Sequence, residues 1–181
     1  MTRLTRLAFA AIALAALPLS LHAACPPLLD FKINSLAGKP MDFCQFEGHP
    51  ILVVNTASKC GYTYQFEKLE GMYQQYKDKG LVVLGFPSND FRQELVSNKE
   101  VGDFCRMTYG VQFPMVEKTS VVGDGANPFF RQLAAITQEN PKWNFHKYLI
   151  APDGKTVYSF ATAVEPDAAT VMSKLQPMLK K

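Results

Sequence analysis

Cys60 is the residue whose type and position point most directly to chemistry. It follows the apolar run Ile51–Thr56, which predicts a buried strand, and it precedes Gln65–Tyr76, which has helical spacing. A cysteine in such a turn faces a helix N-terminus, where free N–H groups and the helix dipole favour the thiolate, and Lys59 adds a positive charge. A thiolate attacks disulfides, metal ions and peroxide O–O bonds, so this position indicates redox chemistry. From position alone, a buried and unreactive cysteine remains an open alternative.

The remaining cysteines and the histidines do not suggest a metal site. The chain has four cysteines but no Cys-x-x-Cys pair, and neither His49 nor His146 stands at ligand spacing from a cysteine. We therefore predict no zinc or copper site and no cofactor. Four cysteines allow three disulfide pairings, and the sequence alone does not choose among them.

Residues 1–24 have the composition of a secretory signal peptide. Two arginines and no acidic residue precede an alanine- and leucine-rich run, and the small residues Ala23-Ala24 follow it. We expect this segment to be cleaved and the protein to be exported, to the periplasm of a Gram-negative bacterium, where oxidising conditions permit disulfides. Lipid anchoring at Cys25 is the alternative, although His22 does not fit a lipoprotein signal.

The charge and hydropathy of the chain bear on which classes of partner to expect. The formal net charge of the whole chain is +3, and loss of Arg3 and Arg6 with the leader leaves +1. This balance gives no indication of a nucleic-acid or membrane-surface partner. No apolar run after the leader is long enough to span a membrane.

Residues 25–181 predict a single α/β domain, in which apolar β-branched runs indicate strands and helical spacing indicates helices. The expected elements are a hairpin (Leu28–Ile33 and Met41–Phe46), strands at Ile51–Thr56, Leu81–Phe86, Ser120–Val122, Lys147–Ala151 and Thr156–Phe160, and helices at Gln65–Tyr76, Asn98–Tyr109, Asn127–Ile136 and Pro166–Leu179. After the hairpin, this order is that of the thioredoxin fold, a central mixed β-sheet flanked by helices. In that fold the first strand-to-helix turn carries the reactive cysteine, and Cys60 stands there.

Three segments of the chain resemble the glutathione peroxidase family. They are residues 60–65 (CGYTYQ), 84–94 (LGFPSNDFRQE) and 143–149 (WNFHKYL), in the family's order and approximate spacing. The resemblance implies that Cys60 is the peroxidatic cysteine, which attacks the terminal oxygen of a hydroperoxide and becomes a sulfenic acid. Trp143 and Asn144 match the family's tryptophan and asparagine, which hold the thiolate and stabilise charge on the leaving oxygen.

Asp90 departs from the family pattern. Relatives usually carry glutamine between the residues that match Asn89 and Phe91. An ionised aspartate accepts hydrogen bonds only and would repel a thiolate. Four roles remain open for Asp90: a neutral donor, a proton shuttle through water, a side chain turned away while Gln93 or a backbone N–H takes its place, or a loop cap.

Cys105 lies in a segment, residues 102–109, that resembles the one carrying the resolving cysteine in thioredoxin-dependent members of the family. The resemblance implies that Cys105 condenses with the Cys60 sulfenic acid to a disulfide, which an external dithiol reduces. The alternative is a cysteine buried in a helix that never reacts.

Cys25 and Cys44 lie outside the shared motifs and flank the predicted hairpin. In an exported protein we expect them to form a structural disulfide, which would stabilise the domain by roughly 3 kcal/mol. Lipidation of Cys25, or exchange of this pair with the catalytic cysteines, are the alternatives.

The family resemblance implies a thiol-dependent peroxidase that reduces hydrogen peroxide and organic hydroperoxides in response to oxidative stress. The expected reductant is a thioredoxin-like protein or glutathione, and the former is favoured because no arginine cluster suggests a glutathione site. Tetrameric, glutathione-using relatives carry an extra segment before the Trp-Asn motif, and because the stretch 123–143 is short here, the resemblance implies a monomer. Two alternatives remain: a peroxide sensor or thiol oxidase that passes oxidation to client proteins, and a non-catalytic thioredoxin-fold binding module with an inert Cys60.

Overall fold

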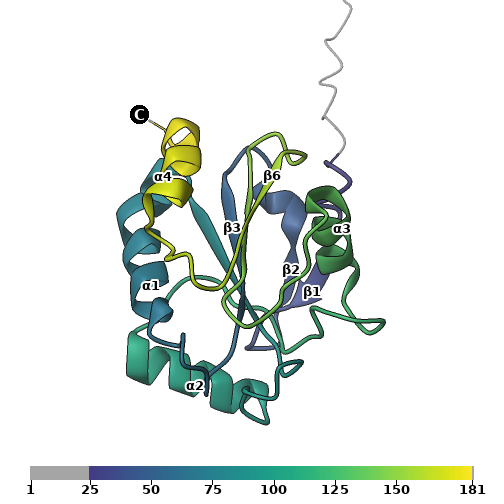
Figure 1. Cartoon of the computed structure of the whole chain (residues 1–181), viewed down its shortest axis with the longest axis vertical. Helices are drawn as coiled ribbons and strands as arrows, with labels where there is room; N and C mark the ends of the chain where they lie inside the picture. Colours follow the sequence, from purple (N-terminus) through teal and green to yellow (C-terminus); the bar gives the residue numbers. More distant parts are fainter. Residues whose placement is uncertain (1–24, 181) are drawn as a thin grey trace, which may run out of the picture.

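A four-stranded mixed sheet forms the centre of the molecule in the computed structural model, which describes residues 25–180. The predicted signal peptide, residues 1–24, lies outside the described residues. The strands run in the order β4-β3-β5-β6, namely β4 (Val82–Pro87), β3 (Ile51–Thr56), β5 (Lys147–Ile150) and β6 (Val157–Phe160). β3 pairs parallel with β4 and antiparallel with β5, and β6 pairs antiparallel with β5. This sheet and its flanking helices confirm the predicted thioredoxin-like fold (Figure 1).

Two layers cover the sheet, one on each face (Figure 1). On one face the core contains residues of α1 (Gln65–Tyr76), α2 (Asn98–Tyr109) and α4 (Ala169–Leu175). On the other face it contains residues of α3 (Pro128–Thr137), and Ile33 and Met41 of the hairpin β1 (Lys32–Asn34) and β2 (Pro40–Asp42) pack against it. Short 3₁₀ helices complete the described chain: η1 (Phe43–Phe46), η2 (Lys77–Lys79) and η3 (Gln176–Met178).

β3 lies between two partner strands, and its sequence explains this position. All of its residues are buried, as expected for a strand covered on both faces. Because side chains alternate along a strand, Leu52 and Val54 pack toward α1 and α2, whereas Ile51 and Val53 pack toward α3. The C-terminal end of this rigid strand leads directly into the turn that holds Cys60.

The bounds predicted for α1 and α2 are confirmed. Ser97 caps α2, since its Oγ accepts the Glu100 N–H while the Glu100 carboxylate accepts the Ser97 N–H. Gly110 ends α2 in the left-handed conformation, with φ 64°. Both ends of this helix are therefore fixed by local hydrogen bonds.

The N-terminal hairpin is shorter than predicted. The predicted second strand, Met41–Phe46, ends at Asp42, because the Asp42 carboxylate accepts the N–H of Cys44 at 3.0 Å and turns the chain into η1. Cys25 and Cys44 form a disulfide here, which ties the described N-terminus to the hairpin.

Two further predicted elements differ from the structure. The strand predicted at Ser120–Val122 is absent, and residues Met115 and Val116 make isolated bridges instead. The reason is that the backbone N–H groups of residues 121 and 122 are taken by the carboxylate of Asp90. The C-terminal helix, predicted for Pro166–Leu179, begins only at Ala169 and continues as η3 after Leu175.

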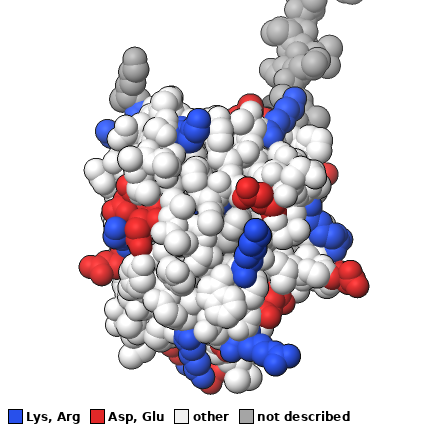
Figure 2. All heavy atoms as spheres, in the orientation of Figure 1, with Lys and Arg blue, Asp and Glu red and all other residues white. Residues whose placement is uncertain are grey.

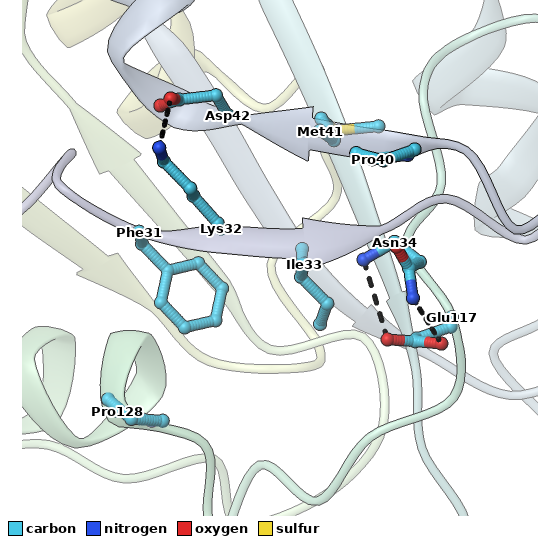
Figure 3. A pocket seen from close by; sticks show the side chains of 9 residues that line it. All are labelled: Phe31, Lys32, Ile33, Asn34, Pro40, Met41, Asp42, Glu117 and Pro128. Carbon is cyan, nitrogen blue, oxygen red and sulfur yellow. Dashed lines mark hydrogen bonds and ion pairs between the residues drawn. The ribbon is translucent and has the colours of Figure 1, made fainter.

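A cavity of about 740 Å³ lies against the hairpin and contains none of the predicted site residues (Figure 3). Lys32 and Asp42 form an ion pair across the two strands at 3.2 Å, and Asn34 donates to Glu117. Acidic and basic side chains are interspersed on the face shown in Figure 2. From residue 25 to residue 180, no helix has the length and apolarity that a membrane crossing requires.

Candidate active site

Cys60 occupies the turn between β3 and α1, with only 8% of its surface exposed. Its Sγ accepts a hydrogen bond from the backbone N–H of Tyr62 at 3.4 Å. The turn is fastened by Thr63, whose Oγ1 accepts the Cys60 N–H at 3.0 Å and lies 2.6 Å from the Cys60 carbonyl oxygen. The sulfur of Cys60 is thus buried, with one backbone N–H donor aimed at it, in the turn that precedes α1.

Trp143 and Asn144 are held in place by Asn55, near the end of β3. The Asn55 side chain donates to the carbonyl oxygen of Trp143 at 3.1 Å and accepts the N–H of His146 at 3.0 Å. The backbone oxygen of Asn55 accepts the N–H of Phe145. Phe145 has a φ of 62°, which is rare for an aromatic residue, so these hydrogen bonds hold a strained backbone. Asn55 therefore fixes the predicted Trp-Asn pair to the strand that positions Cys60.

Gln93 links the Cys60 turn to Asn144. Its backbone oxygen accepts the N–H of Lys59 at 2.8 Å, and its side-chain oxygen accepts from the Asn144 Nδ2 group at 2.8 Å. Asn144 is fully buried. With the Gln93 oxygen engaged in this way, the NH₂ group of Gln93 is available as a donor beside the Cys60 turn.

Trp143 is 40% exposed and its ring packs against Phe91, with 5.3 Å between the ring centroids. A cavity of about 630 Å³ opens beside it, and its lining includes Tyr62, His146 and Ala163. Burial lowers the pKa of His146 to about 4, so this side chain is uncharged at neutral pH. Tyr62, whose N–H donates to the Cys60 Sγ, therefore lines this cavity together with other aromatic and polar side chains.

Asp90 makes its hydrogen bonds to residues 120–122. Its Oδ2 accepts the N–H groups of Val121 at 2.6 Å and Val122 at 3.1 Å, and its Oδ1 accepts the hydroxyl of Ser120 at 2.9 Å. Among residues 25–180, Asp90 forms no hydrogen bond with Cys60. This geometry is that of a loop cap.

Replacing Asp90 is expected to affect stability more than peroxide chemistry. Asp90→Ala removes three hydrogen bonds to one carboxylate, and we expect a loss of about 1–2 kcal/mol in the free energy of unfolding. The rate constant of Cys60 with hydrogen peroxide should change less than about threefold, since the contacts of Asp90 lie elsewhere. Urea unfolding and stopped-flow oxidation measure the two quantities, with Asp124→Ala, an exposed aspartate of the neighbouring loop, as control. A large loss of rate with unchanged stability would contradict this expectation.

Cys105 lies on the inward face of α2 and is 1% exposed. Burial raises the pKa of its thiol to about 12, and the charge of Glu94 acts in the same direction. Cys60 and Cys105 belong to the same hydrophobic core, and both are free thiols in this structure.

The sequence patterns did not identify two polar residues that position this region. Asn55 is the one described above, and its only signal is an amide within a strand whose other residues are apolar or β-branched. Lys147 is fully buried on β5, where its Nζ donates to the carbonyl oxygens of Thr162 (at 3.1 Å) and Val164. Burial lowers the pKa of Lys147 to about 7. Lys147 thereby anchors residues 162–164, of which Thr162 and Ala163 line the cavity beside Trp143.

No three His, Cys, Asp or Glu side chains gather into a potential metal site in the part of the chain that the structure describes. An unpaired cysteine with a backbone N–H donor at the turn between β3 and α1 is a site typical of thiol oxidoreductases.

Comparison with known proteins identifies the family. The family model for glutathione peroxidase matches residues 28–134. The glutathione peroxidase-like peroxiredoxin GPX5 of Chlamydomonas reinhardtii is 43% identical over 146 residues, which are 78% of this chain and 90% of that protein. The hydroperoxy fatty acid reductase gpx1 of Synechocystis sp. is 40% identical over 148 residues, 76% of this chain and 88% of that protein. The crystal structure of T. cruzi GPX1 has a TM-score of 0.67 at 31% identity and covers 83% of this chain and 95% of its own.

The chain belongs to the glutathione peroxidase family, and it is an oxidoreductase that acts as a thiol peroxidase.

Proposed function

We propose that this peroxidase uses Cys60 as its peroxidatic cysteine and Cys105 as its resolving cysteine. The observation that carries the proposal is the hydrogen bond from the Tyr62 N–H to the Cys60 Sγ in the turn that precedes α1. In the first step the Cys60 thiolate attacks the terminal oxygen of the hydroperoxide, the O–O bond breaks, and Cys60 becomes a sulfenic acid. The departing oxygen takes a proton and leaves as water or an alcohol.

Three side chains beside the Cys60 turn would assist this step. We assign the donor roles to Trp143, Asn144 and Gln93, because Gln93 joins Asn144 directly to the backbone of Lys59. Amide and indole N–H groups can stabilise negative charge on both the sulfur and the departing oxygen. In this assignment Gln93 supplies the amide that relatives carry at the position of Asp90.

The cavity beside Trp143 suggests how an organic hydroperoxide would reach Cys60. At about 630 Å³ it is large enough for a substrate bigger than hydrogen peroxide, and its lining includes Tyr62, which contacts the Cys60 sulfur. The name of the Synechocystis relative, hydroperoxy fatty acid reductase, supports an organic substrate. We therefore infer activity toward organic hydroperoxides as well as hydrogen peroxide.

The second step regenerates the enzyme through Cys105. Its sulfur would attack the Cys60 sulfenic acid, so that an S–S bond forms, the S–O bond breaks and water leaves. An external dithiol, which we infer to be a thioredoxin-like protein rather than glutathione, then reduces the disulfide and is itself oxidised to a disulfide. We further propose that the mature enzyme is exported to the periplasm, as residues 1–24 and the Cys25–Cys44 disulfide suggest. We propose that it acts there as a monomer.

Stopped-flow fluorescence tests the two-cysteine cycle, because the only tryptophan of the chain is Trp143. The mature wild type should show a phase whose rate rises with peroxide concentration, followed by a concentration-independent phase in which the disulfide forms. Cys105→Ser should keep the first phase within about twofold and lose the second, and its sulfenic acid should react with dimedone. A first phase no faster than that of an ordinary free thiol would exclude the proposed role of Cys60.

Mass spectrometry of the protein purified from a Gram-negative host after expression of the full chain tests export. A mature N-terminus at Ala24 or Cys25 in the periplasmic fraction is expected, and a mass increase from acyl chains at Cys25 would favour the lipid-anchored alternative. An uncleaved chain in the cytoplasm would contradict export.

A further inference from the structure

Glu94 is a buried carboxylate at the base of the Cys60 turn that none of the steps above uses. It is 8% exposed, and its Oε1 accepts the N–H groups of Ser58 at 3.0 Å and Leu95 at 2.7 Å. Its Oε2 is also buried and has no hydrogen-bond partner among residues 25–180. Burial raises the pKa of Glu94 above that of an exposed glutamate, which makes the carboxylate a stronger base.

The hydrogen bonds of Glu94 attach it to the Cys60 turn rather than to α2. Ser58 stands two residues before Cys60, so the carboxylate is fixed to the backbone that carries the peroxidatic sulfur. Leu95 begins the short segment that leads to Ser97, the N-cap of α2. Cys105 lies on α2, so its sulfur must approach this turn, to which Glu94 is bound, in order to attack Cys60.

Cys105 needs a proton acceptor in order to react. Its thiol is buried with a pKa of about 12, so it is protonated at neutral pH, and only a thiolate is an effective nucleophile toward a sulfenic acid. The charges that act on it are those of Glu94 and Arg106. Arg106 cannot accept a proton, whereas Glu94 can.

We propose that Glu94 accepts the thiol proton of Cys105 when Cys105 attacks the Cys60 sulfenic acid. The S–S bond forms as the Cys105 proton passes to Oε2 of Glu94, and the S–O bond of Cys60 breaks. The departing hydroxide takes this proton and leaves as water, so that Glu94 returns to its ionised form. The inference deepens the proposed two-cysteine function and rests on it.

Glu94→Gln tests the inference, since the amide oxygen can still accept the N–H of Ser58 but cannot accept a proton. With Trp143 fluorescence as readout, the peroxide-dependent phase should stay within about twofold of wild type. The disulfide-forming phase should slow by about 10²-fold, the usual size of a general-base effect. Glu94→Asp, which keeps a carboxylate, should restore part of this loss.

The pH profile separates proton transfer from a structural effect. In wild type the disulfide-forming rate should fall as the pH is lowered through the pKa of Glu94, because a protonated carboxyl cannot accept a proton. In Glu94→Gln this fall should be replaced by a steady increase with pH, as hydroxide becomes the base. Lys118 also acts on the charge of Glu94, and Arg106 on that of Cys105, but both residues are kept in Glu94→Gln, so an acidic fall that is lost in this variant belongs to Glu94.

Glu70→Gln is the matched control, because Glu70 is another buried carboxylate, which accepts the N–H groups of Gln112 and Phe113. It should leave both phases nearly unchanged. Equal disulfide-forming rates in Glu94→Gln and wild type would overturn the inference while leaving the two-cysteine cycle intact. Absence of the second phase in wild type would instead refute the proposed role of Cys105. If Glu94→Gln does not fold, a wild-type disulfide-forming rate without the acidic fall would also overturn the inference.

Discussion

Cys60→Ser is expected to reduce the rate of hydroperoxide reduction by about 10³-fold or more, the scale of loss when an enzyme loses its nucleophile. A serine hydroxyl stays protonated at neutral pH, and it cannot form a sulfenic acid. Loss of hydrogen peroxide in the presence of a thioredoxin-like reductant measures the effect. The same variant should give no dimedone adduct at residue 60 and no disulfide to Cys105.

The fold provides a control for this result. Cys60 contributes one hydrogen bond through Sγ, while the Thr63 contacts that fasten the turn use the Cys60 backbone. Serine should preserve those backbone contacts, so the free energy of unfolding should change by no more than about 1 kcal/mol. Activity above about a tenth of wild type in a correctly folded variant would show that another group carries the chemistry.

Removing the Cys25–Cys44 disulfide by the double change Cys25→Ser and Cys44→Ser is expected to lower the free energy of unfolding by about 3 kcal/mol. The bond closes a loop with a sequence separation of 19 residues, and opening it increases the entropy of the unfolded chain. Urea unfolding gives the value, under conditions in which Cys60 and Cys105 stay as free thiols in both wild type and the double variant.

Peroxidase activity should be nearly unchanged in the same double variant at a temperature well below its midpoint of unfolding. The hairpin packs against the face of the sheet that carries α3, whereas Cys60 and Cys105 belong to the core on the other face. Wild type whose Cys25–Cys44 bond has been reduced should show the same loss of stability. A change below about 1 kcal/mol in both would mean that the unfolded chain gains little freedom when the bond is broken.

The fold was predictable wherever local sequence determines structure. Ile51–Thr56 reads as a strand buried on both faces because every residue is apolar or β-branched except Asn55, and α2 is delimited by the Ser97 cap and Gly110. The strand predicted at Ser120–Val122 was wrong for a non-local reason. The N–H groups of Val121 and Val122 bind the carboxylate of Asp90, which stands 31 and 32 residues earlier, and no local pattern contains that contact.

The candidate site was predictable to the extent that it rests on motifs. Cys60, Trp143 and Asn144 stand in segments that carry the family resemblance, and the structure links two of these segments through Gln93. The sequence did not show that Asn55 holds the Trp143 backbone, nor that Lys147 is fully buried. Both facts depend on which strands become neighbours, and a pattern along one strand does not contain that information.

Buried Lys147 couples folding to proton release. Its folded-state pKa of about 7 lies below the ordinary value of 10.5, so between these pH values the unfolded chain holds a proton that the folded protein has released. The free energy of unfolding therefore gains a contribution that increases with pH across this interval, whereas below pH 7 the folded protein must bury a charged ammonium group. A neutral amine keeps its hydrogen bonds to Thr162 and Val164 without the cost of burying a charge. The wall of the cavity beside Trp143 is thus held more firmly as the pH rises from about 7 toward 10.5, and the pH dependence of unfolding would reveal this linkage.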